Sequence, residues 1–284
     1  KQLLARLESE LEDPFFFAHK ELDHLFFQEE SMQLVPKDLI SRISEETSKT
    51  CYSSFQKMLI EDRIDLFFLG DFNEIEVLEI LKKFNLTGRK DTVNIQYRQE
   101  YSNVLREGII RKNLGQSILE TGYHSTIGYG DDQKMALLLV NGLLGAFPHS
   151  KLFTQVREKE GLAYTVSSHL DLFSGFLRLF AGINRQNRNK ARKLMNDQLL
   201  NIKNGRFTDS EINQTKEMIR RTMLLSQDNQ DSTIDREYLS IFFGKSVLDL
   251  DTLIETLEQV DKEAICRAAS SLKLQAIYFM EGAE

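Results

Sequence analysis

The sequence predicts an α+β fold, a two-layer sandwich in which helices cover an antiparallel sheet. Two observations support this prediction. Strand-like apolar runs are grouped in the second half of the chain, and amphipathic segments of helical length lie around them. A sheet with an apolar face buries it against helices, which gives this architecture. With 284 residues, the chain is long enough for two domains with their own cores.

The first part of the chain is expected to begin with helices. An apolar leucine stripe runs through residues 3–11, and Asp13-Pro14 interrupts it. Two amphipathic helices follow between Pro36 and Leu59, with Ser44 and Thr47 as candidate caps. The opening segment has neither Met nor a helix cap, so we expect the chain to be a fragment cut inside its first domain.

The rest of this part predicts one strand, one helix and a linker. The run IDLFFLG at residues 64–70 is almost wholly apolar and has the length of a strand. The amphipathic segment EIEVLEILKKF follows it as a helix. Residues 87–113 are polar and charged without a sustained helical pattern, so we place the linker there, with the second domain starting at about Leu105.

The second domain predicts strands separated by helices. Thr208 to Glu211 form a capping box that opens one of the later helices. The predicted order is a strand (SILETGYHSTIGY), a long helix (residues 132–144), a short helix after Ser150, two strands (LAYTVSSHL and GFLRLFAGI), helices from Asn189, and a last strand (AIYFMEG).

The corner between the short helix and the next strand carries the most informative residues. Ser150 can cap the helix, and Gly161 suits the left-handed residue that ends it. The strand then starts at Leu162. This arrangement brings the Arg157 guanidinium and the Tyr164 phenol to one end of both elements, where both can donate hydrogen bonds to a peptide carbonyl.

This corner resembles the C-terminal domain of the zinc peptidase family of pitrilysin, insulin-degrading enzyme and the mitochondrial processing peptidase, the inverzincins. The resemblance runs through LLVNGLLG at residues 138–145, SKLF at 150–153 and REKEGLAY at 157–164. More weakly, LFFLGDF at residues 66–72 resembles the last strand of a preceding domain, and residues 208–216 resemble a later helix. The chain is most like the short bacterial partner chains that lack zinc.

The resemblance implies a tandem of two domains with the same fold. Residues 1–100 would be the C-terminal part of a first pitrilysin-like α+β domain, and residues 105–284 a complete second one. In relatives, the pair that matches Arg157 and Tyr164 grips the substrate backbone opposite the zinc.

The resemblance also implies a second group of site residues, in the glycine-rich segment before the corner. In relatives this segment lines the substrate path and needs a flexible backbone. The matching residues here are Gly142, Gly145 and Ser150.

The zinc motif of this family, H-x-x-E-H, is missing from the sequence. The nearest pair, His19 and His24, is five residues apart, about 140° out of phase on a helix, so the two rings do not face one ion. Counting back from Pro14 places Arg6 near the position of the third ligand, and a cation does not bind zinc. We therefore expect no metal ligand and no catalytic residue in this chain, with zinc held by a partner or by an upstream domain.

Composition and remaining motifs exclude several other functions. The net charge of −7 and the isoelectric point near 5.4 argue against nucleic-acid binding, and the basic residues 185–193 are expected to be a solvated helix face. No apolar run is long enough for a membrane span. The distant Cys51 and Cys266 suit a reducing compartment, so we expect a cytoplasmic protein. His149-Ser150, with His169 as a further base, lacks the G-x-S-x-G elbow of a serine hydrolase.

The sequence thus predicts the non-catalytic, substrate-gripping half of a zinc metallopeptidase. Its partners would be a peptide substrate and a homologous zinc-bearing chain or a second copy. Two alternatives remain open. The chain is the downstream portion of a complete peptidase whose H-x-x-E-H lies before residue 1, or it is a non-enzymatic scaffold subunit.

Overall fold

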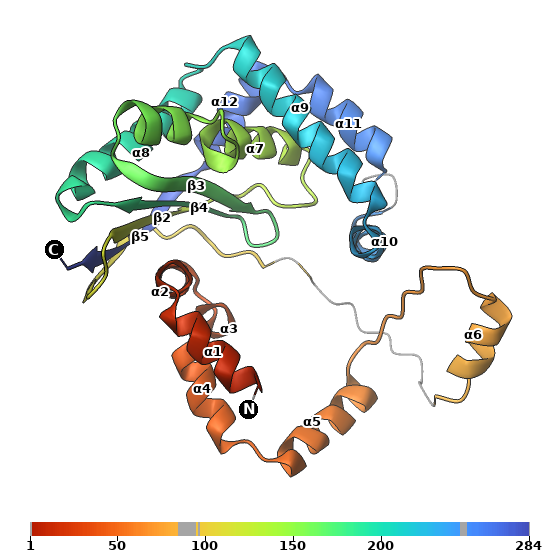
Figure 1. Cartoon of the computed structure of the whole chain (residues 1–284). Helices are drawn as coiled ribbons and strands as arrows, with labels where there is room; N and C mark the ends of the chain where they lie inside the picture. The colour runs from red at the N-terminus through yellow and green to blue at the C-terminus, as the bar shows by residue number, and fades with distance from the viewer. Residues whose placement is uncertain (1, 85–94, 96, 245–248, 284) are drawn as a thin grey trace.

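The computed structural model describes residues 2–84, 95, 97–244 and 249–283 (Figure 1). The first residues of the predicted linker, 87–94, lie outside this set. Among the residues with described structure, no helix combines the length and the apolar character that crossing a bilayer requires.

The first part of the chain is helical, as predicted. Asp13 caps α2, because its carboxylate accepts hydrogen bonds from the N–H groups of Phe15 and Phe16 at 2.8 and 3.0 Å. Thr47 caps α5 through a reciprocal capping box with Thr50. The helices are α1 (Gln2–Glu12), α2 (Pro14–Phe26), α3 (Glu30–Gln33), α4 (Pro36–Glu45), α5 (Ser48–Glu61) and α6 (Glu74–Leu81).

The described strands form one five-stranded sheet in the order β1-β5-β2-β4-β3. Three of the four pairings are antiparallel, and the edge strand β1 pairs parallel with β5. β1 lies within the segment that the sequence predicted as linker. The strands are β1 (Arg106–Lys112), β2 (Ser117–His124), β3 (Ala163–Asp171), β4 (Phe176–Ile183) and β5 (Lys273–Gly282).

Helices of the second half cover one face of this sheet, which confirms the predicted α+β sandwich (Figure 1). The main core lies between the two layers, where Leu119, Leu179 and Phe279 of the sheet are buried with Leu143 and Ile265 of the helical layer. The helices of the second half are α7 (Lys134–Asn141), η1 (Gly142–Ala146), η2 (Leu152–Lys159), η3 (Arg185–Asn187), α8 (Arg188–Lys203), α9 (Asp209–Leu225), η4 (Ser226–Asp228), α10 (Gln230–Phe243), α11 (Leu250–Gln259) and α12 (Lys262–Ser271).

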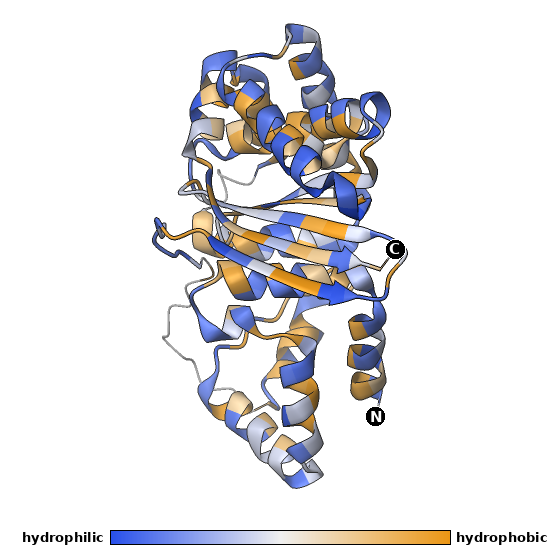
Figure 2. Cartoon of the chain, turned by 90° about the vertical axis from the view of Figure 1, so that its left-hand side faces the viewer, coloured by the Kyte–Doolittle hydropathy of each residue, from blue (hydrophilic) through white to orange (hydrophobic). Residues whose placement is uncertain are grey.

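The opposite face of the sheet is covered by α2, so the sheet lies between two helical layers (Figure 2). Ala18, Leu22 and Phe26 are spaced four apart on α2 and are completely buried. They pack against a second core that includes Phe176 and Tyr278 of the sheet. This contact joins the first part of the chain to the second.

The predicted strand at residues 64–70 is wrong. The segment is extended but belongs to no sheet, and Leu66, Phe68 and Leu69 are about half exposed, at 50, 49 and 49%. Strands need neighbours for their backbone hydrogen bonds, and within the described residues no strand lies beside this segment. Its Phe67 ring instead contacts Tyr238 of α10 at 5.6 Å between ring centres.

Candidate peptide-binding site

The helix that carries Arg157 is η2, a π-helix anchored by its buried side. Leu152 and Val156 are fully buried, and the Ser150 carbonyl accepts hydrogen bonds from the N–H and hydroxyl of Thr154 at 2.9 and 3.0 Å. The Ser150 hydroxyl, the predicted cap, accepts only a long hydrogen bond of 3.5 Å from the Phe153 N–H. π-helical turns are rare and frequently occur at functional sites.

The turn after η2 brings the next strand back against the end of the helix. Gly161 has a φ of +60°, which confirms the predicted left-handed glycine. The Leu162 N–H then donates to the carbonyl of Val156 at 3.0 Å. The residues that flank this hydrogen bond are Arg157, at the end of the helix, and Tyr164, at the start of the strand.

Tyr164 lies at an irregularity of β3. Ala163 pairs with Ile183 and Thr165 with Gly182, so Tyr164 has no opposite residue on β4. A bulge of this kind changes the direction of a side chain, and the Tyr164 side chain is 63% exposed. β3 is also the last strand in the order of the sheet.

Arg157 is exposed, and its guanidinium carbon lies 4.7 Å from the centre of the Phe153 ring. Across the described part of the chain, neither Arg157 nor Tyr164 has a hydrogen bond or ion pair with another side chain. Glu160, three residues after Arg157, is engaged elsewhere, since it pairs with Lys190 at 2.9 Å and this hydrogen bond lowers its pKa. The donors of the predicted pair are therefore uncommitted.

The glycines of the preceding segment lie buried in η1, and their place along a substrate path stays a prediction. Gly142, Gly145 and Ser150 are all buried. A Cβ on Gly142 would lie 2.4 Å from the Thr215 methyl, and one on Gly145 would lie 2.7 Å from the backbone nitrogen of Ser168. η1 can pack this closely on α9 and β3 only because both residues lack a side chain.

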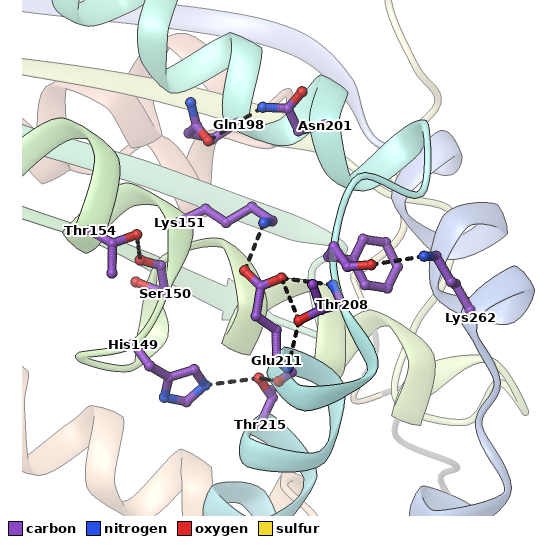
Figure 3. A network of polar contacts seen from close by, with 11 residues as sticks. His149, Ser150, Lys151, Thr154, Gln198, Asn201, Thr208, Glu211, Thr215 and Lys262 are labelled. Carbon is purple, nitrogen blue, oxygen red and sulfur yellow. Dashed lines mark hydrogen bonds and ion pairs between the residues drawn. The ribbon is translucent and has the colours of Figure 1, made fainter. Parts of the chain in front are cut away.

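A polar network holds the segment between η1 and η2 against the start of α9 (Figure 3). His149 Nε2 lies 2.9 Å from the Thr215 hydroxyl, and Lys151 Nζ donates to Glu211 Oε1 at 2.8 Å. Glu211 also forms the predicted capping box with Thr208, whose N–H donates to Glu211 Oε2 at 2.7 Å. The sequence predicts the capping box but not its link to Lys151, because Lys151 and Glu211 are 60 residues apart.

The network also shifts the pKa values of Glu211 and His149. Burial raises the pKa of Glu211, but the hydrogen bonds from Lys151 and Thr208 outweigh it, so the net pKa is lowered. Burial lowers the pKa of His149, against the raising effect of Glu211. The His149 ring bonds Thr215 and stacks on Phe147, which agrees with rejecting a His-Ser hydrolase pair.

The residues weighed as zinc ligands do not fit a zinc site. His19 Nδ1 lies 2.5 Å from Glu120 Oε1, whereas His24 Nδ1 lies 3.3 Å from the Gln33 carbonyl. Arg6 forms a surface ion pair with Glu10 at 2.9 Å. Over the residues described, no group of three His, Cys, Asp or Glu side chains is arranged to hold a metal ion.

The basic residues 185–193 form an ion-paired helix face. Arg185 pairs with Glu281 at 2.8 Å and Arg192 with Glu107 at 3.3 Å. This is the structural role that the sequence predicted for them.

Comparison with known proteins confirms the resemblance. The model of the family described as Peptidase M16 inactive domain matches residues 47–219, more than half of the chain. The probable inactive metalloprotease YmfF of Bacillus subtilis is 29% identical over the whole chain, which spans 67% of YmfF. The uncharacterized zinc protease YmxG of the same organism is 25% identical over 74% of the chain and 51% of its own length.

A solved structure agrees with these relatives. The crystal structure of a conserved protein from Enterococcus faecalis V583 superposes with a TM-score of 0.95 at 38% identity, covering 99% of this chain and 67% of that one. The chain therefore belongs to the M16 peptidase family, and it is of the inactive kind, a non-catalytic member of a family of metallopeptidases.

Proposed function

We propose that this chain is the substrate-holding half of a two-part peptidase chamber. It binds the peptide backbone through Arg157 and Tyr164, and a homologous zinc-bearing chain cleaves the bound peptide. The observation that supports this most directly is that both side chains are exposed and uncommitted. The corner that carries them, in contrast, is anchored by buried residues.

The chemistry of the pair suits a peptide carbonyl. A guanidinium and a phenol both donate hydrogen bonds and neither competes as a base at neutral pH. Donors held in place beside a carbonyl stabilise the negative charge that develops on its oxygen during hydrolysis. The zinc of the partner would supply the activated water.

The edge position of β3 supports an extended peptide as the ligand. In the part of the chain with described structure, no strand pairs with the outer edge of β3. Such an edge offers backbone donors and acceptors to an added strand. The glycine-rich segment would contribute through Ala146 and Pro148, which are exposed, because Gly142 and Gly145 are buried.

The proposal places the assembly in the cytoplasm. Cys51 and Cys266 are both free thiols, which suits a reducing compartment. The partner would be a zinc-bearing homologue, and the zinc-protease names of several relatives are the support for this.

The proposal is tested by peptide binding and cleavage with matched variants. A fluorescein-labelled unstructured peptide is titrated with the wild-type chain, Arg157→Ala and Tyr164→Phe. Lys159→Ala, on the same turn of η2, and Tyr52→Phe, at an equally exposed tyrosine (62%), are the controls. We expect weaker binding for the first two variants only, and the same order in cleavage once the zinc-bearing homologue is added.

The alternatives give different results. A scaffold subunit would leave peptide binding unchanged in all four variants and would not support cleavage by the homologue. A downstream portion of a complete peptidase would require a longer form of this same chain that cleaves peptide without a partner.

A further inference from the structure

A cluster of charged side chains is enclosed between α2 and the face of the sheet that α2 covers. His19 and Asp23 come from α2, Glu120 from β2 and Arg178 from β4. Glu120 is completely buried, and the side chains of Arg178 and Asp23 are only 11 and 14% exposed. Buried charges are expensive unless they are fully paired, so their contacts decide how firmly α2 is held.

The pairing inside the cluster is incomplete at Glu120. Arg178 Nη2 donates to Asp23 Oδ1, but Arg178 Nε is 3.6 Å from Glu120 Oε2, and neither of these two atoms has a hydrogen-bond partner among the described residues. Glu120 is bonded through its other oxygen, to His19 Nδ1 at 2.5 Å. One guanidinium thus faces two carboxyl groups, and among the described residues the Glu120 side chain has a single hydrogen bond, to the His19 imidazole.

Other ionisable groups around the cluster do not supply a second buried cation. Lys20 of α2 lies 3.6 Å from Asp23 Oδ2 and is 36% exposed. Among the described residues, the Tyr278 hydroxyl of β5 is buried without a hydrogen-bond partner. Burial raises the pKa of Tyr278, and the nearby carboxyl groups of Glu21 and Glu120 raise it further. From β1, Arg106 donates to the Leu25 carbonyl at 3.2 Å and Lys112 lies over the Phe17 ring.

When α2 is packed on the sheet, the surroundings of Glu120 favour the protonated form of its carboxyl group. The Phe180 ring packs against the His19 ring at 5.1 Å between centres, and the His19 side chain is 25% exposed whereas that of Glu120 is fully buried. Burial raises the pKa of Glu120, even though His19 and Arg178 lower it. Burial also raises the pKa of Asp23, against the lowering effect of Arg178.

We propose that α2 and the sheet form a proton-linked latch, in which the buried Glu120 carboxyl takes up a proton when α2 docks on the sheet and releases it when α2 leaves. α2 is the element that joins the N-terminal helices to the sheet, so pH controls how tightly these two parts of the chain are held.

The sign follows from the raised pKa of the buried carboxyl. Docking is strongest at pH values below the ordinary pKa of 4.5 for a glutamic acid and weakens as pH rises from there through the raised value. One proton per docking event limits the effect to about a tenfold change in the docking equilibrium per pH unit.

Hydrogen–deuterium exchange of the full chain tests the latch. Protection factors, corrected for intrinsic exchange, are measured between pH 4.5 and 8.5 for amides of α2, with α12 in the same molecule as reference. We expect α2 to lose protection relative to α12 as pH rises, by up to about tenfold per unit. In Glu120→Gln, which resembles the protonated carboxyl, the ratio should change less with pH than in the wild type, whereas Glu61→Gln, at an exposed ion pair with Lys57, should keep the wild-type slope.

Two results would overturn the proposal: a flat ratio in the wild type, or an unchanged slope in Glu120→Gln. A further measurement does not depend on that variant folding. The ¹³C shift of the Glu120 carboxyl and the ¹⁵N shifts of the His19 ring are followed against pH in the wild type. The Glu120 carboxyl must lose its proton over the pH range in which α2 loses protection. Loss of this proton over a different pH range would exclude the latch.

Discussion

Arg157 and Tyr164 are the residues on which the proposed function depends, and both are exposed. Arg157→Ala removes a charge-assisted hydrogen bond to substrate, worth about 1.5 to 3 kcal/mol, and Tyr164→Phe a neutral one, worth about 0.5 to 1.5 kcal/mol. Since about 1.4 kcal/mol corresponds to a factor of ten, turnover by the assembled peptidase should fall by tens to over a hundredfold and by several-fold, respectively. Thermal melts should be unchanged, and an early melt of both variants would assign the pair to structure instead.

Gly145 provides a second test at this scale, because a methyl group there meets backbone. With Ser168 N at 2.7 Å from the added Cβ, Gly145→Ala should lower the free energy of unfolding by about 1 to 3 kcal/mol. Gly115→Ala is the control, since nothing lies within 4 Å of its Cβ. Urea unfolding measures both, and equal stability of the two variants would contradict the packing role.

What could be predicted for single residues depended on how local their partners are. Gly161 and the capping box of Thr208 and Glu211 are set by neighbours within a few positions, and both predictions are confirmed. The contacts that require glycine at residues 142 and 145 come from residues 215 and 168. No sequence pattern shows such contacts, so the sequence does not predict that these two glycines are buried.

For whole elements, the sequence predicts most helices. It predicts a strand where the strand is buried and apolar, but not where the strand is exposed. β2 is buried along its whole length and was found by its apolar character. β1, with the sequence REGIIRK, is an exposed edge strand with mixed polarity, so nothing in its pattern separated it from the linker. The apolar segment 64–70 shows the opposite error. Its composition predicts a strand, but a strand forms only where a neighbouring strand accepts and donates its backbone hydrogen bonds.

The helix formed by α7 and η1 should not tolerate charge on its buried side. Leu143 is 1% exposed, so Leu143→Asp buries an unpaired carboxylate. The expected loss is at least about 4 kcal/mol, a large part of the roughly 5 to 15 kcal/mol that stabilises a domain. Leu200→Asp, at a leucine 43% exposed on α8, is the matched control. Circular dichroism melts should show the first variant unfolded and the second near wild type; a normally melting first variant would show that this helix is an exposed partner surface.

At the scale of the molecule, the purified chain should carry no stoichiometric zinc. The candidate ligands point to different partners, since His19 is bonded to Glu120 and His24 to a backbone carbonyl. Metal analysis after dialysis measures the zinc content directly. One tightly bound zinc per chain, lost in His19→Ala or His24→Ala, would contradict this prediction.

The contact between the two parts of the chain could not be predicted. The apolar stripe of α2 at residues 18, 22 and 26 indicated a buried face but not which surface buries it. The sequence predicted a sheet covered on one side only. The domain boundaries at residues 100 and 105 remain a prediction, and α2 of the first part packs on the sheet of the second.

The order of the strands has a consequence for biosynthesis. β5 is the last of the five strands to leave the ribosome, yet it lies between β1 and β2 and pairs with both. Until residues 273–282 have emerged, β1 has no neighbour and the buried faces of β2 and α2 lack one side of their core. A nascent chain lacking β5 therefore exposes unpaired strand edges, which are the kind of surface that chaperones bind.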